Sequence, residues 1–467
     1  MRNASCTFSV MRYNGGESKE GGRFMKKLLC LMLAFVLAVP LTACHKHIPG
    51  PEATCTTDQI CLDCGKILIE ALGHEAGEEA TCAAPQVCTR CGEVLAEALP
   101  HTPNGPVSCA VSQVCSVCGE VLAQASGHNV GADGICSVCG KQVCQPGQTY
   151  IAPGRGSYTN TDADGIIPET VNSGHYNNDL DAYYAGTVLI CGDYGVEYFT
   201  PDPTGTGGYA SIVNDFAAKY PQLGVTALIV PKCCAFETPS GYPDAGESIK
   251  SFINSTYAMM DARVKTADAF AVMEPHAGEY MFYRTDHHWT SLGAYYASVA
   301  YCQANGIEPL SLDDYDTVVR GGVTGTLYMY GNHDGHLKRN PDYTVCHFPT
   351  TGYTMQCYNG GWYNGIAVNG EYRDYASVFI NGDNPLTVIN TDNENGKTLL
   401  IFKESYGNAF VPYMIDYYQR IVVVDIRAET DSVATLIDRY DVTDALFINN
   451  AQAAMGFQSI IRGKAMS

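Results

Sequence analysis

The sequence predicts an α/β domain in which helices cover both faces of a parallel β-sheet. Short runs that are apolar throughout, such as residues 225–230 and 399–402, are expected to be buried strands. Stretches with helical periodicity alternate with these runs, for example at residues 209–220. A strand that is apolar along its whole length is buried on both faces, which is typical of a parallel sheet between two layers of helices.

Five such strands are expected in chain order, at residues 187–193, 225–230, 399–402, 421–425 and 445–448. A helix is expected to follow the third strand and to continue to Tyr418. Residues 311–396 are rich in Gly, Tyr, Asn and Asp and fit no regular pattern, so we expect an irregular insertion near the functional site. The α/β domain as a whole is predicted to span residues 186–467.

A different module is predicted to precede this domain. Twelve of the 21 cysteines lie between Cys55 and Cys144, and only six lie in residues 145–467. Residues 145–185 are rich in Gly, Asn, Asp and Pro and are predicted to be a linker. The net charge of −21 disfavours nucleic acid as a partner, because phosphate contacts need clustered Lys and Arg.

Residues 25–44 have the pattern of a bacterial lipoprotein signal peptide. Two lysines precede an apolar run, residues 28–39, which is too short to cross a bilayer by itself. The segment ends in the letters LTAC, which resemble a lipobox, so Cys44 is the expected lipidation site. Acyl chains on Cys44 would anchor the protein, outside the cytoplasm, to the bacterial cell membrane. A plain secretory signal is the alternative.

Residues 1–24 do not fit in front of a signal peptide. We expect Met25 to be the true start of the protein. The letters KEGG at residues 19–22 are what a purine-rich ribosome-binding site encodes when it is translated by mistake.

Residues 45–144 form an internal repeat with a period of 27 residues. Three units share the spacing C-x5-C-x2-C and begin at Cys55, Cys82 and Cys109, and a histidine recurs at the same period. Three cysteines and one histidine make a complete tetrahedral ligand set for Zn²⁺. The repeats resemble Cys-rich, zinc-ribbon-like repeats of bacterial surface proteins, which implies a spacer or interaction stalk without catalysis.

We expect one closed structural zinc site per unit, in which each histidine precedes the cysteines of its own unit. The four predicted sites are His47, Cys55, Cys61 and Cys64; His74, Cys82, Cys88 and Cys91; His101, Cys109, Cys115 and Cys118; and His128, Cys136, Cys139 and Cys144. If the histidine instead follows its cysteines, only three sites form and His47 is left over. A disulfide framework is the alternative to zinc, because an exported protein meets an oxidising environment.

Ser405 has the position of a catalytic nucleophile. In open parallel sheets, ligands bind beyond the carboxyl ends of the strands. Ser405 lies between a predicted strand that ends at Phe402 and a predicted helix that begins at Tyr406. A backbone N–H at such a helix start can stabilise an oxyanion. The same position also suits a helix N-cap, so taken alone it leaves both interpretations open.

A second stretch, residues 284–290 (RTDHHWT), supplies groups that activate a serine. Asp286, two residues before His288, can hold the Nδ1–H of that imidazole and leave its Nε2 free as a base. Ser405, His288 and Asp286 together then supply the nucleophile, the base and the orienting acid that acyl transfer requires. His287 is the alternative base, and no cofactor is expected for catalysis.

These stretches also carry a resemblance to a known family. Residues 283–296 (YRTDHHWTSLGAYY) resemble the signature of the bacterial DHHW protein family, which is similar to the SGNH-hydrolase-like proteins of alginate O-acetylation. The block around Ser405, with Pro412 and residues 425–427 (DIR), resembles the serine block of the same family. The resemblance covers residues 185–465 and implies a flavodoxin-like, three-layer α/β/α fold.

The resemblance also implies roles for individual residues. Ser405 is the expected nucleophile, His288 the base and Asp286 the orienting acid. Glu404 is a departure, because SGNH enzymes usually carry Asp before the serine. These enzymes take further oxyanion donors from a glycine and an asparagine, and the candidates here are Gly325, Asn408 and Asn450.

Two kinds of function fit these observations. The first is a serine O-acyl esterase or O-acetyltransferase that acts on O-acyl groups of extracellular or cell-wall polysaccharide. The alternative is a non-catalytic surface adhesin or glycan-binding scaffold. A zinc-dependent hydrolase is disfavoured, because the predicted zinc sites leave no open coordination position. Hydrolase and transferase use the same residues, so the sequence does not choose between them.

Overall fold

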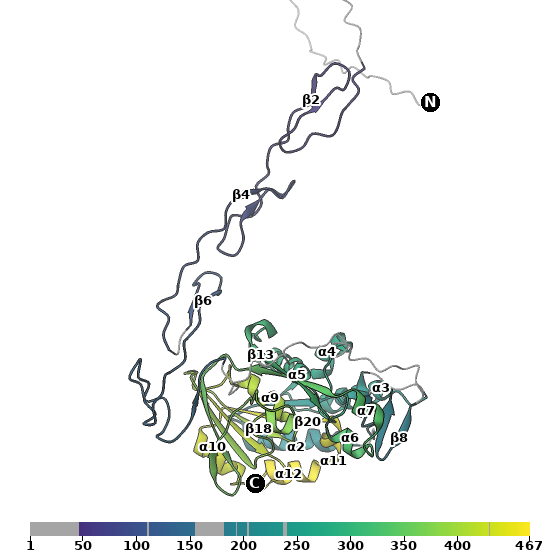
Figure 1. Cartoon of the computed structure of the whole chain (residues 1–467), viewed down its shortest axis with the longest axis vertical. Coiled ribbons are helices and arrows are strands. Elements are labelled where there is room, and N and C mark those ends of the chain that lie inside the picture. Colours follow the sequence, from purple (N-terminus) through teal and green to yellow (C-terminus); the bar gives the residue numbers. More distant parts are fainter. Residues whose placement is uncertain are drawn as a thin grey trace, which may run out of the picture. The chain divides into compact units, whose positions relative to one another are not determined.

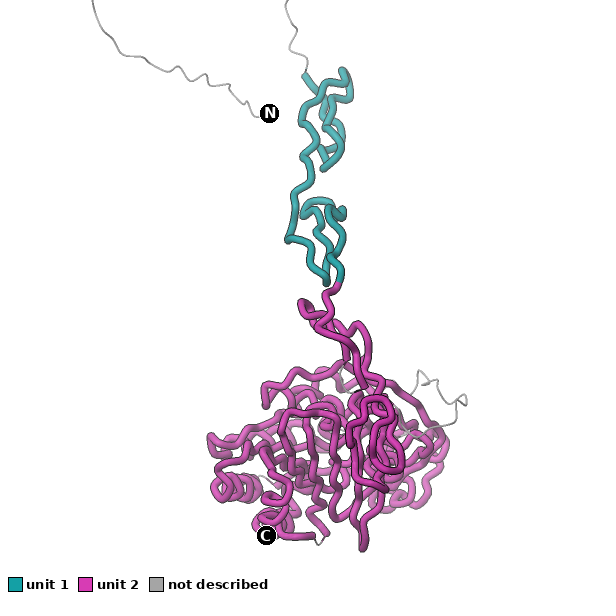
Figure 2. Tube along the Cα trace, turned by 90° about the vertical axis from the view of Figure 1, so that its left-hand side faces the viewer, with its two compact units in different colours: residues 1–100 teal, residues 101–467 magenta. Residues whose placement is uncertain are grey.

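The computed structural model describes residues 46–109, 112–154, 182–192, 194–202, 205–236, 241–428 and 430–467. The chain divides into two compact units, Met1–Pro100 and His101–Ser467, shown in teal and magenta in Figure 2. The predicted start at Met25, the signal peptide and the lipidation site Cys44 lie outside the described residues. Within the described part of the chain, no helix combines the length and the apolar character that a membrane span requires.

Five parallel strands form the centre of the larger unit. Their order across the sheet is β12 (Val264–Ala267), β11 (Gly224–Val230), β20 (Asp444–Asn450), β18 (Thr398–Lys403) and β19 (Arg420–Asp425). Antiparallel strands extend the sheet beyond β19, in the order β17 (Leu386–Thr391), β15 (Tyr353–Tyr358) and β16 (Trp362–Asn364), and β7 (Tyr150–Ile151) also pairs with β15. The carboxyl ends of the five parallel strands therefore share one edge.

Helices pack on both faces of this sheet (Figure 1). On β18, Leu399 and Ile401 share a core with α5 (Ser291–Asn305) and α9 (Gly407–Met414). Leu400 and Phe402 share the opposite core with α2 (Thr206–Lys219) and α3 (Ala245–Ala258). The alternation follows from the two-residue period of a strand. The predicted three-layer α/β class with a parallel central sheet is confirmed.

The remaining helices are short. They are α4 (Ala269–Met273), α6 (Thr326–Tyr330), α7 (Gly335–Arg339), α8 (Tyr375–Val378), α10 (Val433–Tyr440), α11 (Ala451–Gly456) and α12 (Gln458–Ala465).

Three sequence expectations differ from the structure. The apolar run at 187–193 contains a strand, β9 (Val188–Cys191), but it pairs with β8 (Tyr183–Ala185) and β10 (Tyr194–Val196) in a separate antiparallel sheet. Burial on both faces makes a strand apolar in either kind of sheet, so the apolar pattern could not distinguish a parallel from an antiparallel strand.

The second difference concerns strand order. β20, the last parallel strand in sequence, inserts between β11 and β18, whereas the flavodoxin order places the last strand at the edge.

The third difference concerns residues 311–396. They are not irregular throughout, because β13 (Asp316–Val323) and β14 (Asp342–Phe348) form an antiparallel hairpin and β15 to β17 extend the main sheet. Polar Thr, Tyr and Asn side chains interrupt the apolar pattern of these strands.

The cysteine repeats fold as small hairpins. The strand pairs are β1 (Gln59–Ile60) with β2 (Ile67–Ile69), β3 (Gln86–Val87) with β4 (Val94–Ala96), and β5 (Gln113–Val114) with β6 (Val121–Ala123). The C-x2-C segment forms each turn, and the glycine after it has a positive φ, +70° at Gly65 and +75° at Gly92. That backbone conformation favours glycine.

The predicted linker is partly a structural element of the larger unit. β7 adds to the main sheet through β15, and the Tyr150 hydroxyl donates to Asp392 at 2.5 Å. Lys141 of the last repeat pairs with Glu394 at 3.0 Å. The last repeat is thereby held against the α/β domain inside one compact unit. Residues 155–181 lie outside the described part.

Candidate active site

The residues singled out in the sequence meet at the carboxyl edge of the parallel sheet. Ser405 follows β18, and its Oγ lies 2.8 Å from Nε2 of His288. Nδ1 of the same ring lies 2.6 Å from Oδ1 of Asp286. A hydroxyl, an imidazole and a carboxylate are therefore aligned in series, although 117 positions separate the serine from the histidine. This is the arrangement that activates a serine for attack on a carbonyl.

Glu404 holds the turn that presents Ser405. Its Oε1 accepts from the backbone N–H of Asn450 at 2.9 Å and from the side-chain amide of that residue at 3.0 Å. Its Oε2 accepts from the backbone N–H of Tyr406 at 3.0 Å. The glutamate thus ties the start of α9 to the end of β20. Among the described residues, no acceptor takes the backbone N–H of Ser405, which leaves it available to an oxyanion.

Asp286 is fixed by donors on both of its oxygens. Oδ1 accepts from the backbone and ring N–H groups of His288, and Oδ2 accepts from the backbone N–H and hydroxyl of Thr326, at 2.9 and 3.0 Å. Burial alone would raise the pKa of Asp286, but the hydrogen bond from His288 and the nearby imidazole charges lower it below its usual range. A Cβ added at Gly325 would lie 2.4 Å from the Asp286 side chain, so glycine is needed where α6 begins.

Aromatic side chains join the segment that contains His288 to the segment that contains Ser405. The Tyr375 ring stacks on His288 with centroids 3.9 Å apart and planes 6° from parallel. The Tyr375 hydroxyl donates to the carbonyl of Ser405 at 2.8 Å. The indole N–H of Trp289 donates to the carbonyl of Tyr406 at 2.9 Å, which explains the tryptophan beside the two histidines.

His287, the alternative base, does not contact Ser405. Its Nδ1 lies 2.6 Å from the hydroxyl of Thr326. Burial and the neighbouring His288 lower the pKa of His287 to about 4, so this ring is neutral at pH 7. His288 is the imidazole that reaches the serine.

The three oxyanion candidates have other partners. The backbone N–H of Gly325 donates to the Thr285 hydroxyl at 2.8 Å, and Asn450 donates to Glu404. The Asn408 amide donates to Asp383 at 3.0 Å. These contacts make all three residues parts of the frame around the site, and their role as oxyanion donors stays a prediction.

Sequence patterns missed several residues of the site. Lys232 is 2% exposed, pairs with Glu197 and donates to Gln452 at 3.1 Å. Its place just after the predicted strand 225–230 was a usable signal, because that strand ends at the same edge as β18. Thr326 and Tyr375 lie in the stretch 311–396 that fitted no pattern, and nothing local marks them.

The repeats hold groups of cysteine and histidine that could bind a metal ion. In the smaller unit, the ligand atoms of Cys55, His74, Cys88 and Cys91 lie within 4.8 Å of one another. In the larger unit, those of Cys109, His128, Cys136 and Cys139 do the same. His47, Cys61 and Cys64 form a third group, and no disulfide links the described cysteines.

The predicted grouping of these ligands is wrong in one position. In these two four-residue groups, the histidine joins the C-x2-C pair of its own repeat, but the remaining cysteine comes from the preceding repeat. Cys55 therefore does not group with His47, Cys82 does not group with His74, and Cys109 groups with His128 instead of His101. Cys144 belongs to no group among the described residues, and its Sγ lies 3.8 Å from the Gln148 carbonyl.

A shortened loop in the fourth repeat explains why Cys136 and Cys139 form its C-x2-C pair and Cys144 stays outside the group. Only seven residues separate His128 from Cys136, whereas 13 separate His101 from Cys115, and the missing segment carries the first cysteine of the unit. Backbone N–H groups, that of Cys118 above all, lower the pKa of Cys115 to about 5. A C-x2-C turn whose backbone N–H groups point at the sulfur favours the thiolate form, which is the form that binds metals.

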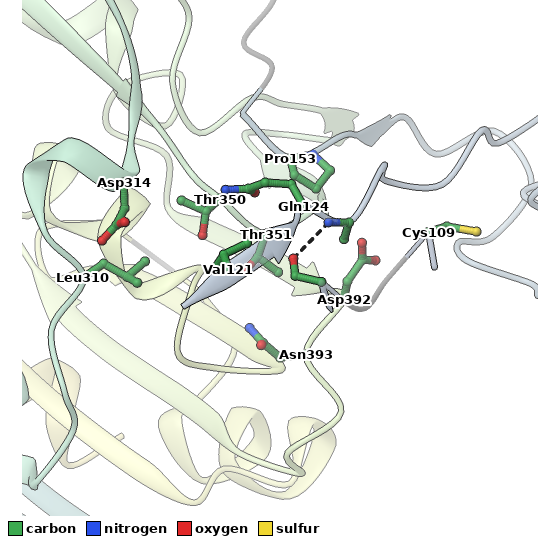
Figure 3. A pocket seen from close by; sticks show the side chains of 13 residues that line it. Cys109, Val121, Gln124, Pro153, Leu310, Asp314, Thr350, Thr351, Asp392 and Asn393 are labelled. Atoms are coloured by element: carbon green, nitrogen blue, oxygen red, sulfur yellow. Dashed lines mark hydrogen bonds between the residues drawn. The ribbon is translucent and has the colours of Figure 1, made fainter. Parts of the chain in front are cut away.

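A small cavity lies between the repeats and the α/β domain within the larger unit (Figure 3). Its volume is about 200 Å³, and Cys109, Val121, Gln124, Leu310, Thr350 and Asp392 are among its lining residues. None of its lining residues belongs to the Ser405 site.

Comparison with known proteins places this geometry in a family. A family model described as DHHW protein matches residues 160–424, more than half of the chain. The crystal structure of a DHHW family protein from Eubacterium siraeum is 31% identical, with a TM-score of 0.57, over 61% of this chain and 98% of that one. No curated protein matches the chain.

Two further solved structures are more distant. PatB1 of Bacillus cereus is 17% identical with a TM-score of 0.48, over 60% of this chain and 98% of its own. The O-acetyltransferase domain of AlgJ from Pseudomonas putida is 13% identical with a TM-score of 0.34, over 60% and 98%. Neither is close enough to carry an inference, but the family match and the structure from E. siraeum are sufficient: the chain belongs to the DHHW protein family.

Proposed function

We propose that the α/β domain is a serine O-acyl esterase or O-acetyltransferase that acts on O-acyl groups of extracellular or cell-wall glycan. The observation that carries the proposal is the series Ser405 Oγ, His288 Nε2 and Asp286 Oδ1, joined at 2.8 and 2.6 Å. In this series Ser405 is the nucleophile, His288 the base and Asp286 the orienting acid.

The chemistry proceeds in two halves. Ser405 Oγ attacks the acyl carbonyl while His288 Nε2 takes its proton, and the ionised Asp286 stabilises the imidazolium that forms. The Ser405 backbone N–H accommodates the charge on the carbonyl oxygen. The leaving alcohol takes the proton from His288, and an acyl-serine remains. Water or a second hydroxyl then attacks this ester, and His288 acts as the base again.

Labelling of the serine tests this proposal. We expect the full chain to hydrolyse p-nitrophenyl acetate and to react with a serine-directed sulfonyl fluoride, with the added mass on the peptide that contains Ser405. Ser405→Ala should abolish both, and Ser248→Ala, on α3 and outside the site, should leave both unchanged. A wild-type chain that shows neither reaction would favour the alternative, a non-catalytic surface adhesin or glycan-binding scaffold.

We further propose that Zn²⁺ occupies the cysteine and histidine groups of the repeats. Three thiolates and one imidazole are a closed tetrahedral set, which suits a structural ion and leaves no position for a reacting water. A hairpin of about 20 residues cannot bury a core, so the ion supplies the stability that packing does not. Lipidation of Cys44 would attach these repeats, and the acyl-transfer domain after them, to the outer face of the bacterial cell membrane.

A further inference from the structure

The two adjacent imidazoles of the site lie side by side, and both direct Nδ1 toward the same carboxylate. The ring centroids of His287 and His288 are 3.8 Å apart, with 38° between the planes. Both Nδ1 atoms face Asp286 Oδ1, at 3.9 Å for His287 and 2.6 Å for His288. Since Nε2 lies on the far side of the ring from Nδ1, both Nε2 atoms lie away from the carboxylate, and on that side His288 Nε2 meets Ser405 Oγ at 2.8 Å.

The hydrogen bonds around Thr326 indicate which nitrogen of His287 carries the proton. An ionised carboxylate only accepts, so the Thr326 hydroxyl donates to Asp286 Oδ2, at 3.0 Å. With its proton directed at Asp286, the oxygen of that hydroxyl accepts from the Nδ1–H of His287, at 2.6 Å, and we infer this tautomer from the two contacts. In a neutral ring, Nε2 is therefore a bare acceptor.

This acceptor has no partner within the part of the chain that the structure describes. The His287 side chain is 24% exposed, so a bound molecule can reach it. The carbonyl of His287 accepts from the Tyr406 hydroxyl, which fixes the backbone beneath the ring. A fixed, accessible acceptor beside the catalytic base needs a donor, and an alcohol O–H is such a donor.

We propose that His287 positions the acyl acceptor by binding a second hydroxyl of it, so that the acceptor is a vicinal diol of a sugar. The inference rests on the proposed acyl-serine chemistry. The attacking hydroxyl meets His288 Nε2, and its neighbour on the same sugar meets His287 Nε2. A single molecule of water or of a simple alcohol reaches only one of the two acceptors at a time, whereas one diol engages both, which favours transfer to glycan over hydrolysis.

The transfer step balances with these groups alone. The acceptor oxygen forms a bond to the acyl carbon of the acyl-serine, and its proton passes to His288 Nε2. The bond between the acyl carbon and Ser405 Oγ breaks, and Oγ takes the proton back from His288. The hydroxyl on His287 keeps its proton throughout, so His287 is a positioning residue.

A comparison of two acceptors tests the assignment. We expect the wild-type protein, with p-nitrophenyl acetate as donor, to acetylate trans-1,2-cyclohexanediol about tenfold more efficiently than cyclohexanol, beyond the twofold statistical factor, because of the additional hydrogen bond. His287→Asn keeps an N–H toward Thr326 but lacks the outer nitrogen. It should lose this preference while the p-nitrophenol burst stays within about threefold of wild type.

Two further variants sharpen the test. His287→Gln, which can place an amide oxygen near the lost Nε2, should restore part of the preference. His336→Asn, on the exposed side of α7, should retain all of it. A wild-type protein that forms the acyl-serine but transfers to both acceptors equally overturns the inference and leaves the esterase proposal intact. A preference that survives in His287→Asn also overturns it, whereas absence of any burst removes the proposed function itself.

Discussion

Asp286 decides which nitrogen of His288 is basic. Its carboxylate holds Nδ1–H at 2.6 Å, and Nε2 is thereby the lone pair that faces Ser405 at 2.8 Å. The low pKa of Asp286, caused by the His288 hydrogen bond in spite of burial, keeps the acid ionised at any pH at which the protein would work. A carboxylate that remains charged can stabilise an imidazolium in the transition state.

Replacement of this acid by its amide should therefore impair chemistry more than binding. We expect Asp286→Asn to lower kcat for p-nitrophenyl acetate by about 100-fold or more with little change in KM, because the amide can donate to Nδ1 and stabilise the wrong tautomer. Asp334→Asn, at the N-cap of α7, should behave as wild type. A kcat that is unchanged in Asp286→Asn would show that the acid does not orient the base.

His347, a buried histidine away from the site, should make the stability of the protein depend on pH. Burial lowers the pKa of His347 to about 4, and its Nδ1 lies 2.6 Å from the Tyr413 hydroxyl. In the unfolded chain the pKa returns to 6.5, so between these values the unfolded state binds more protons than the folded state. The free energy of unfolding is therefore unaffected by protonation of this group above pH 6.5. It decreases as the pH falls toward 4, by up to about 3 kcal/mol.

Urea unfolding at about pH 7 and about pH 5 measures this effect. We expect His347→Gln to be less stable than wild type near neutral pH, where the Tyr413 contact is lost, but to lose less stability on acidification. His336→Gln, which changes an exposed imidazole, should keep the wild-type slope. An identical slope in His347→Gln and wild type would contradict the assignment.

At the scale of secondary structure, the site depends on three elements that meet at one sheet edge. β18 ends at Lys403 and leads into the Ser405 turn, β20 ends at Asn450, which donates to Glu404, and α6 begins at Thr326, which donates to Asp286. Each element contributes a strand end or a helix start, where backbone groups are free to bind side chains. Small displacements between these elements should therefore reach the catalytic geometry.

Gly325→Ala tests that dependence. The added methyl carbon would lie 2.4 Å from Cβ and Oδ2 of Asp286, so either α6 or the acid must move. We expect kcat to fall roughly 10- to 100-fold while the thermal unfolding midpoint falls only slightly, because the site and not the core is displaced. Gly361→Ala, where no atom lies within 4 Å of the new carbon, is the matched control. A kcat equal to wild type would mean that the loop accommodates the methyl group without moving the acid.

At the scale of the whole molecule, the repeats and the domain are stabilised by different means. The two faces of the sheet bury apolar side chains such as Ile401 and Phe402 completely. In the repeats the buried apolar residues are almost all cysteines, and Leu62 and Val117 are exposed. Metal binding is therefore expected to decide whether the repeats fold, and the α/β domain should depend on it much less.

Metal counting tests the ligand groups. We expect Cys55→Ser to contain about one zinc ion fewer per chain than wild type, because Cys55 groups with His74, Cys88 and Cys91. Cys144→Ser should lose none, since Cys144 lies outside the groups that the described residues form. The measurement is elemental analysis of the reduced full chain without chelator. Loss of about one zinc ion in Cys144→Ser would instead support the grouping by repeat, in which Cys144 is a ligand.

The sequence by itself determined the local features of this protein. Wholly apolar strands located β11, β18, β19 and β20 within one or two residues, because burial on both faces leaves a direct trace in composition. Asp286, His288 and Ser405 were proposed from short local motifs, and the structure brings their side chains together. The 27-residue period was visible directly in the amino-acid sequence.

Only the tertiary structure decided what depends on packing between distant segments. It inserted β20 beside β18 and gave Thr326 and Tyr375 their contacts with Asp286 and His288. It also drew Cys55 and Cys109 into the ligand groups of the repeats that follow them. These contacts join residues far apart in the chain or in different repeats. Periodicity and spacing in a sequence reflect interactions between near neighbours only. Contacts between distant segments depend on how those segments pack in the folded protein, so local patterns cannot predict them.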